Sequence, residues 1–278
     1  MTVRVGIMQG RLSTPPAGRI QGFPAASWAE EFPRARAAGL SCIEWIYETS
    51  GADANPLGTD AGVARLRALA DAHGVHVWSV CADWYMEERL VGPGGVNPTS
   101  VEHLRWLVGR CGALSVRYVI LPFVDSSSLR SEAERAAIVT LLRGVAPVAA
   151  DLGVEIHLET DLPPARFRAL LEAVGHPAVR ANYDTGNSAA LGYDPAEELT
   201  LLGPWLGSVH IKDRVRGGGT VPLGSGDANF AACFRAFRSI GFARWYVLQV
   251  ARGETGAEVD WAVRNRQFVE RQVLEAAA

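Results

Sequence analysis

The stretch that decides the fold is Leu152-Gly153-Val154-Glu155-Ile156-His157-Leu158-Glu159. A glycine ends an amphipathic segment, a short apolar run of strand type follows, and the run closes on an acidic residue. The first part of this signal recurs at Ala38-Gly39-Leu40, His73-Gly74-Val75 and Ile240-Gly241-Phe242. Glycine in these positions is typical of a left-handed helix C-cap, so each site predicts a helix that ends where a strand begins.

Short apolar runs of strand type lie along the whole chain, at Val3–Met8, Cys42–Ile46, Val75–Val80, Val116–Leu121, Val154–Glu159, Val179–Asp184, Gly207–Ile211 and Trp245–Val250. Segments with apolar residues three and four positions apart alternate with them and predict helices, at Ser27–Ala38, Asp60–His73, Ser100–Cys111, Glu132–Asp151, Pro164–Val174, Pro195–Leu202, Phe230–Ile240 and Glu258–Val273. Strands that alternate with helices in this way pair in parallel through right-handed crossovers.

Two architectures satisfy this alternation, an open doubly wound sheet and a closed barrel. The count of strands and helices matches one full turn of a (β/α)8 barrel, which favours closure. The residues after the first strand, Met8-Gln9-Gly10-Arg11, lack the GxGxxG pattern of dinucleotide-binding sheets. We therefore predict an α/β fold, a (β/α)8 TIM barrel, with residues 1–278 as a single domain.

The composition disfavours several classes of partner. The chain has 278 residues, 48% of them hydrophobic and 21% charged, and a formal net charge of −3. This balance favours neither nucleic acid nor an anionic membrane as a partner, and no run approaches the roughly 18 apolar residues of a membrane span. The first residues lead directly into a strand without a signal-peptide pattern, and the four cysteines form no CxxC pair. We therefore expect reduced thiols and a cytoplasmic protein.

Three long segments follow predicted strands, at Gln9–Ala26, Ala82–Pro98 and Lys212–Asn229. In a TIM barrel all three rise from the C-terminal rim, where active sites are built. Long loops in a compact domain are more often functional than idle. The candidate site is therefore expected at this rim.

Each of the last four strands ends in a polar side chain that can bind a metal: Glu159, Asp184, His210 and Gln249. Because side chains alternate along a strand, residues at the same height of consecutive strands can point to a common centre. Each residue alone has an ordinary interpretation as a cap, core or ion-pair residue, but their recurrence predicts one bound divalent ion. The mixed oxygen and nitrogen set suits Mn²⁺, our first choice, and also Mg²⁺, Co²⁺ or Zn²⁺.

Several motifs are spread along the chain: Gly6-Ile7-Met8-Gln9-Gly10-Arg11-Leu12-Ser13, Ile43-Glu44-Trp45-Ile46, Leu158-Glu159, Asn182-Tyr183-Asp184-Thr185-Gly186-Asn187, His210-Ile211-Lys212-Asp213 and Leu223-Gly224-Ser225-Gly226-Asp227. With these motifs the chain resembles, over essentially its whole length, the sugar phosphate isomerase/epimerase family of xylose isomerase-like TIM barrels. The resemblance implies that Glu159, Asp184 and His210 hold the metal, together with a residue after the eighth strand. It also implies an isomerase or epimerase that transfers a proton next to the carbonyl of a keto sugar, polyol or sugar phosphate.

Two positions depart from the family pattern. Gln249 stands where the epimerases have a second acid, and an amide can ligate a metal but cannot act as a base near neutral pH. Asn187 stands where ketose epimerases have a histidine. Glu159 remains as the candidate catalytic base, and Glu44, at the end of the second strand, is either a second catalytic acid or the ion-pair partner of an arginine. Both a one-base isomerisation and a dehydration by a lyase stay open.

The candidate substrate contacts follow strands one, seven and eight: Gln9, Arg11, Lys212, Arg214, Arg216 and Arg252. Several cations around one rim suit a phosphate or carboxylate, and the resemblance implies a substrate-binding role for Arg216. Trp84 and Tyr85 are candidates for an apolar wall over the sugar or for anchors of their loop. The expected ligand is a small-molecule sugar or sugar phosphate.

Two further interpretations were weighed against this one. Apurinic endonuclease chemistry needs a richer histidine set for three zinc ions and a basic face, and of the histidines only His210 is placed correctly. A barrel that binds a sugar without converting it is the non-enzyme alternative, with Gln249 as the substitution that removed catalysis. His157 lies one layer deeper than Glu159 on the same inward face and is predicted to be either a core residue or a residue that supports a metal ligand. The resemblance also implies a homo-oligomer.

Overall fold

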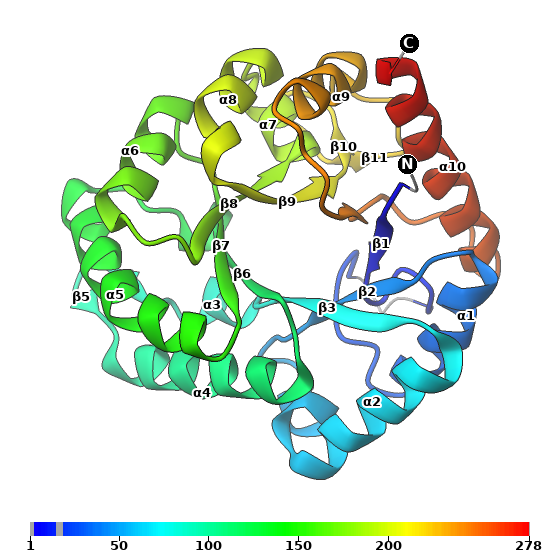
Figure 1. The fold of residues 1–278 in the computed structure, drawn as a ribbon, viewed down its shortest axis with the longest axis horizontal. Coiled ribbons are helices and arrows are strands. Elements are labelled where there is room, and N and C mark those ends of the chain that lie inside the picture. The colour runs from blue at the N-terminus through cyan, green and yellow to red at the C-terminus, as the bar shows by residue number, and fades with distance from the viewer. Residues whose placement is uncertain (1–2, 15–18, 278) are drawn as a thin grey trace.

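The strands close into a barrel (Figure 1). The computed structural model describes residues 3–14 and 19–277. Residues 15–18 of the predicted loop 9–26 therefore lie outside the described part, as do residues 1–2 and residue 278. The barrel strands all pair in parallel, in the order β1-β12-β9-β8-β7-β6-β3-β2. Their bounds are β1 Val5–Met8, β2 Cys42–Ile46, β3 His76–Cys81, β6 Tyr118–Phe123, β7 Glu155–Thr160, β8 Val179–Asp184, β9 Leu206–Ile211 and β12 Tyr246–Leu248.

Helices surround this ring on its outside (Figure 1). The outer helices are α1 Glu31–Ala37, α2 Asp60–His73, α4 Pro98–Leu114, α5 Glu132–Asp151, α6 Pro164–Val174, α8 Pro195–Leu202, α9 Phe230–Ser239 and α10 Glu258–Ala277. The four glycines that predicted helix C-caps, Gly39, Gly74, Gly153 and Gly241, all have positive φ angles, between 62° and 71°. The predicted (β/α)8 TIM barrel is therefore confirmed, and each predicted strand is found with its ends shifted by two residues or fewer.

Two short helices at the C-terminal rim are not apparent in the sequence pattern, α3 Trp84–Glu87 and α7 Thr185–Leu191. The segment of α7 is rich in residues of low helix propensity. It is helical because the Asp184 carboxylate accepts hydrogen bonds from the backbone N–H groups of Gly186 and Asn187. Two small hairpins, β4 Val91–Gly92 with β5 Gly95–Val96 and β10 Asp213–Arg214 with β11 Thr220–Val221, also lie in rim loops.

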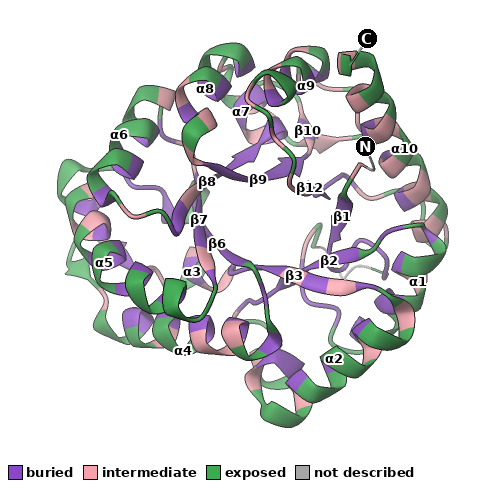
Figure 2. Ribbon diagram, viewed as in Figure 1, coloured by how far each residue is buried: buried purple, intermediate pink, exposed green. Residues whose placement is uncertain are grey.

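The apolar core fills the layer between strands and helices. Figure 2 shows the ring of strands buried and the outer faces of the helices exposed. Inside the ring, several polar side chains of the strands are at most 2% exposed: Glu44, His157, Asn182, Ser208 and His210. Such groups are stable in a core only when they are hydrogen-bonded. The interior of this barrel is therefore a polar network enclosed by an apolar shell.

Two predictions from the composition are checked by the fold. The four cysteines, Cys42, Cys81, Cys111 and Cys233, are buried free thiols. Among residues 3–14 and 19–277, no helix is both long and apolar enough to cross a membrane.

Candidate metal centre

Three predicted ligands converge at the C-terminal mouth of the barrel, which is the end where the parallel strands finish. Glu159, Asp184 and His210 each offer one ligand atom, and these atoms lie within 4.8 Å of one another. His210 Nδ1 is 3.1 Å from Glu159 Oε2 and 3.9 Å from Asp184 Oδ2. The residues end or nearly end the neighbouring strands β7, β8 and β9, and all three are buried. The structure thus brings together three of the four residues expected to bind metal.

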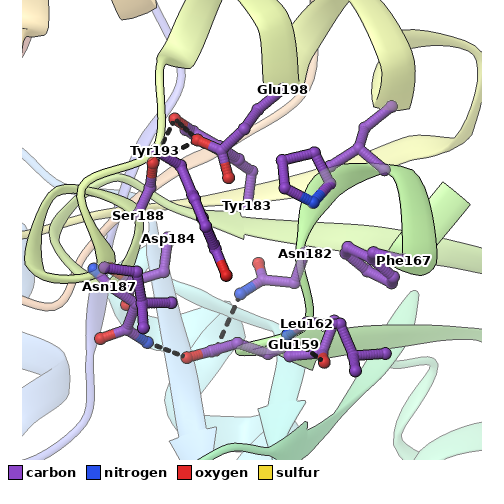
Figure 3. A pocket seen from close by; sticks show the side chains of 14 residues that line it. Glu159, Leu162, Phe167, Asn182, Tyr183, Asp184, Asn187, Ser188, Tyr193 and Glu198 are labelled. Atoms are coloured by element: carbon purple, nitrogen blue, oxygen red, sulfur yellow. Dashed lines mark hydrogen bonds between the residues drawn. The ribbon is translucent and has the colours of Figure 1, made fainter.

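Two amide groups hold the Glu159 carboxylate in place (Figure 3). Asn187 Nδ2 donates to Glu159 Oε1 at 2.7 Å, and Asn182 Nδ2 donates to Glu159 Oε2 at 2.9 Å. Asn182 is itself fixed, because Ser208 Oγ donates to its Oδ1 at 2.7 Å. Asn187, one of the two departures from the family pattern, is therefore in direct contact with the candidate base.

Asp184 uses its two carboxylate oxygens differently. Oδ1 accepts from the backbone N–H groups of Gly186 and Asn187, each at 2.8 Å, and so caps α7. Oδ2 faces the centre and accepts from Lys212 Nζ at 3.2 Å. The helix therefore fixes the carboxylate while one oxygen stays directed at the site of a cation.

His210 is held from behind by Glu44. His210 Nε2 lies 2.7 Å from Glu44 Oε1, and both side chains are fully buried. With the Nε2 proton donated to Glu44, Nδ1 is the atom that faces Glu159 and is available to a metal, as in carboxylate–histidine–metal groups. Burial opposes a charge on the imidazole, but the Glu44 and Glu159 carboxylates outweigh it and raise the pKa of His210 to about 10.

The position of Glu44 differs from the expectation of an acid at the rim. The side chain is 0% exposed and packs beneath His210, away from the substrate side of the centre. Its partner is a histidine, whereas the alternative considered from the sequence was an arginine. Glu44 is thus placed to orient a ligand.

Gln249 directly follows β12 and offers a fourth donor. Its Nε2 donates to Gln21 Oε1 at 3.3 Å, while its Oε1 is buried and has no hydrogen-bond partner among the described residues. A buried carbonyl oxygen without a donor is destabilising, and a cation beside it would supply the missing interaction. Carboxylate, imidazole and amide oxygen donors together suit a divalent ion such as Mn²⁺ or Mg²⁺. The donor set therefore fits the predicted metal.

A cavity of about 640 Å³ opens at this mouth. Glu159 and Gln249 contribute to its lining, so the candidate base and the fourth donor face the same space. Its walls carry both signs of charge: Arg19, Lys212 and Arg214 with Glu48, Asp83, Glu87 and Asp125. The volume is in the range of small-molecule sites.

Two of the predicted substrate contacts, Lys212 and Arg214, line this cavity. Arg214 NH1 also donates to Asn187 Oδ1 at 2.9 Å, which orients the amide that contacts Glu159. An anion bound to Arg214 would therefore be connected to the candidate base Glu159 through Asn187.

The substrate contacts predicted after the first and eighth strands form hydrogen bonds with backbone groups and do not line the cavity. Arg11 Nε donates to the carbonyl of Val250 at 2.8 Å, and Arg252 NH1 donates to the carbonyl of Gly10 at 2.7 Å. Gln9 Oε1 accepts from the backbone N–H of Ile46 at 2.9 Å. None of these three side chains lines the cavity, and their hydrogen bonds join the segment after β1 to the neighbouring chain.

Arg216 and Trp84 also lie away from the cavity. Arg216 is exposed, and its guanidinium packs over Gly192 so closely that a Cβ there would be 2.7 Å from it. Trp84 stacks on His103, with ring centroids 4.2 Å apart, and on Tyr47 at 5.7 Å. Of the two interpretations of Trp84, the contacts fit the anchor of a loop.

The sequence analysis missed residues that complete the site. Gln21 lies between Gln249 and Asp83, because it accepts from Gln249 and its Nε2 donates to Asp83 Oδ2 at 2.6 Å. Burial raises the pKa of Asp83, which lines the cavity two residues after the end of β3. The same strand-end rule that found the ligands would have found Asp83, and Asn182 shares the inward face of Asp184 two residues away.

The chain is also similar to known proteins in sequence and in fold. The profile of the family described as Xylose isomerase-like TIM barrel matches residues 32–272. The chain is 31% identical over 242 residues to a 2-epi-5-epi-valiolone 7-phosphate 2-epimerase of Actinoplanes sp., which spans 86% of this chain and 83% of that protein. It is 27% identical over 195 residues to a 3-oxo-isoapionate decarboxylase of Pectobacterium atrosepticum, 64% of this chain and 68% of that one. The solved structure of a D-allulose 3-epimerase of Methylomonas sp. has a TM-score of 0.74 at 19% identity, over 97% of this chain and 98% of that one.

The fold and site define a class of protein, a TIM-barrel enzyme with a candidate cation site at the C-terminal mouth. More narrowly, the chain belongs to the xylose isomerase-like TIM barrel family. Within that family it is an enzyme of the isomerase and epimerase class.

Proposed function

We propose that the protein is a divalent-metal-dependent epimerase or isomerase that transfers a proton next to the carbonyl of a small keto polyol or its phosphate. The observation that carries this proposal is the convergence of Glu159, Asp184 and His210 beside a cavity that Gln249 also lines. A divalent ion bound there would polarise a substrate carbonyl and favour loss of the neighbouring proton. Mn²⁺ is our first choice, because most of the donors are oxygen atoms.

Glu159 is the base in this proposal. Its carboxylate is held by Asn182 and Asn187 at the cavity, so it does not need to reorganise before it removes a proton. Lys212 and Arg214 line the same cavity and would bind an anionic group of the substrate. Glu44 acts through His210, which it orients, and not as a second acid.

Asp83 is the group that we propose returns the proton. Gln249 cannot do so, because an amide does not titrate near neutral pH. Asp83 lines the cavity together with Glu159, and burial raises the pKa of its carboxyl, which favours the protonated form that an acid needs. An epimerisation then has one carboxyl group that removes a proton and another that supplies one.

The relative with the highest identity given above supports a substrate class. That protein is named as a 2-epimerase of 2-epi-5-epi-valiolone 7-phosphate, a name that includes a ketone and a phosphate. We propose a substrate of this kind, a phosphorylated keto polyol or keto sugar. Arg214 and Lys212 are the cationic side chains that support the phosphate.

A lyase reaction is the second candidate. The relative named as a 3-oxo-isoapionate decarboxylase favours it, since that reaction breaks a bond next to a carbonyl. A lyase needs no proton donor on the opposite face of the substrate. The activity of Asp83 variants therefore distinguishes an epimerase from a lyase.

The test is incubation of the Mn²⁺-loaded enzyme in deuterated water with 2-epi-5-epi-valiolone 7-phosphate and, separately, D-allulose, followed by NMR. We expect deuterium next to the carbonyl together with inversion at that carbon. Glu159→Gln should abolish both, whereas Asp83→Asn should keep deuterium incorporation and lose inversion. Loss of a carbon or of water from either compound would favour the lyase. No exchange with either compound would contradict the proposed substrate class.

Two further properties belong to this proposal. We place the enzyme in the cytoplasm, since its four buried cysteines are free thiols. A homo-oligomer remains a prediction, and light scattering of the purified protein tests it.

A further inference from the structure

A second cavity lies at the opposite end of the barrel, which we call the N-terminal mouth. Its volume is about 580 Å³, close to that of the C-terminal cavity. It is lined by residues at or near the first positions of barrel strands: Arg4, Trp78, Arg117, Tyr118, Gly153, Glu155, Arg244 and Trp245. The proposed catalytic site uses none of these residues.

The charges of this lining do not balance. Three arginines line the cavity with one carboxylate, Glu155. That carboxylate is already paired, because Glu155 Oε1 accepts from Arg244 NH2 and Arg180 Nε at 3.0 Å each, and Oε2 accepts from Arg244 NH1. The charge of Glu155 is therefore matched without Arg4 and Arg117. A concave surface lined by one sign of charge concentrates the opposite sign.

Arg117 lies on an aromatic surface. Its guanidinium carbon is 5.1 Å from the ring centroid of Trp78, and Trp245 lines the same cavity. Deeper in the barrel, Tyr118 stacks on His157 with ring centroids 4.2 Å apart. Indole faces bind planar groups and cations, and arginine presents a planar fork to phosphate or carboxylate. The cavity thus combines an anion-binding part with an aromatic part.

Hydrogen bonds connect Glu155 in this lining to buried groups deeper in the barrel. His157 Nε2 is 3.0 Å from Glu155 Oε2, and its Nδ1 is 2.7 Å from Ser208 Oγ. A Cβ at Gly207 would lie only 2.5 Å from His157 Nε2, so this strand position requires glycine. Glu155, which contacts Arg244, is therefore also held from inside the barrel by the buried His157. A preformed surface binds a ligand with a smaller loss of conformational entropy.

We propose that the N-terminal mouth is a binding site for a small organic anion that carries a phosphate or carboxylate group and a planar ring. Arg4 and Arg117 bind the anionic group, and Trp78 and Trp245 contact the ring. This site is separate from the proposed active site, since the two cavities open at opposite ends of parallel strands.

Calorimetric titration with adenosine monophosphate as the probe tests this proposal. We expect binding by the wild-type protein, at least about tenfold weaker binding of the neutral compound adenosine, and at least about tenfold weaker binding of the nucleotide by the Arg4→Gln/Arg117→Gln variant. Both arginines are exposed, so their replacement should leave the fold intact, which circular dichroism checks.

Two control variants locate the site. Arg105→Gln removes an exposed arginine of α4 and should leave the affinity unchanged. Arg214→Gln removes a cation of the C-terminal cavity and should also leave it unchanged. The proposal is overturned if the wild-type protein does not bind the nucleotide at millimolar concentration, if the double variant binds as well as wild type, or if only Arg214→Gln loses binding.

Discussion

The two mouths of the barrel have cavities of similar size but opposite chemistry. At the C-terminal mouth, the strands end in carboxylates, an imidazole and an amide whose buried oxygen has no hydrogen-bond partner among the described residues. At the N-terminal mouth, arginines surround a single carboxylate whose hydrogen bonds are satisfied. Every barrel strand runs in the same direction. The position of a residue along its strand therefore decides whether it lies at the candidate metal centre or at the arginine-lined cavity.

Strand β7 shows this contrast within one element. Glu155 and Glu159 are four residues apart on the same inward face. Burial raises the pKa of Glu155, but hydrogen bonds from His157 and Arg244 outweigh it and hold that pKa well below its usual range. Glu159 accepts from two amides and lies beside His210, which gives up its proton when a metal binds. Glu155 is therefore held in ion pairs with arginines. Glu159, in contrast, is placed to contact a metal ion or a substrate.

The largest expected effect concerns the carboxylate behind the ligand histidine. Glu44→Ala should weaken Mn²⁺ binding about 10- to 100-fold, because His210 loses the group that fixes its tautomer and orientation. Glu44→Gln keeps an acceptor for His210 Nε2 and should therefore lose less Mn²⁺ affinity than Glu44→Ala. Calorimetric titration of each variant measures this. Unchanged affinity in Glu44→Ala would mean that His210 does not ligate through Nδ1.

Two arginines of the same rim loop form a matched pair. Arg214 lines the C-terminal cavity and Arg216 does not. Arg214→Ala should lower kcat/KM for a phosphorylated substrate by about tenfold or more, since it removes a charge-assisted contact and the partner of Asn187. Arg216→Ala should change it by less than about threefold. The reverse order would restore the role that family resemblance gives to Arg216.

The pH dependence of metal binding reports on His210. The pKa of about 10 means that the metal-free imidazole is protonated at neutral pH, so a metal must displace one proton. The apparent affinity for Mn²⁺ should therefore rise about tenfold per pH unit between roughly pH 6.5 and 8.5. Titrations in buffers of different ionisation enthalpy should show about one proton released. A flat profile would contradict this placement of His210.

The smallest effect on metal binding is expected from a change at the N-terminal mouth. Glu155→Gln should lower the free energy of unfolding by about 1–3 kcal/mol at pH 7, because two arginines and His157 lose a charged partner. Because the folded pKa of Glu155 is depressed, the wild-type advantage is complete above the unfolded value near 4.5 and shrinks as the pH falls below it. Urea denaturation of the wild-type protein and of Glu155→Gln at pH 7 and pH 3.5 measures the difference in stability at each pH. A large loss of Mn²⁺ affinity in Glu155→Gln would contradict the separation of the N-terminal mouth from the metal centre.

Much of this architecture could be predicted from the sequence. Glycine C-caps and alternating strands are local signals, and Gly39, Gly74, Gly153 and Gly241 each lie within two residues of a helix end. The strand-end rule located Glu159, Asp184 and His210 for the same reason, since parallel strands bring their ends to one rim.

Other features depend on geometry that sequence alternation does not contain. The strand register shifts between Ile43 and Glu44 and again between Ala181 and Asn182. Such irregularities change where the following side chain points. Glu44 therefore lies beneath His210.

The long arginines could not be placed either. Arg11 and Arg252 can reach several acceptors from the same backbone position, and they bind carbonyl groups of the loop after β1. A count of cations near a rim does not show which of them face the substrate. The conformation of the loop after β1 determines which arginines point toward the cavity.

The most direct test of the central claim is the metal content of the purified protein and of Asp184→Asn, measured by elemental analysis after incubation with Mn²⁺ and desalting. Asparagine keeps the cap of α7, because its side-chain oxygen can accept the bonds from Gly186 and Asn187, but it removes the charge that faces the centre. The account predicts about one divalent ion per chain in the wild-type protein and little or none in the variant. A wild-type protein that stays metal-free with Mn²⁺, Mg²⁺, Co²⁺ and Zn²⁺, or a variant that retains the ion, would contradict it.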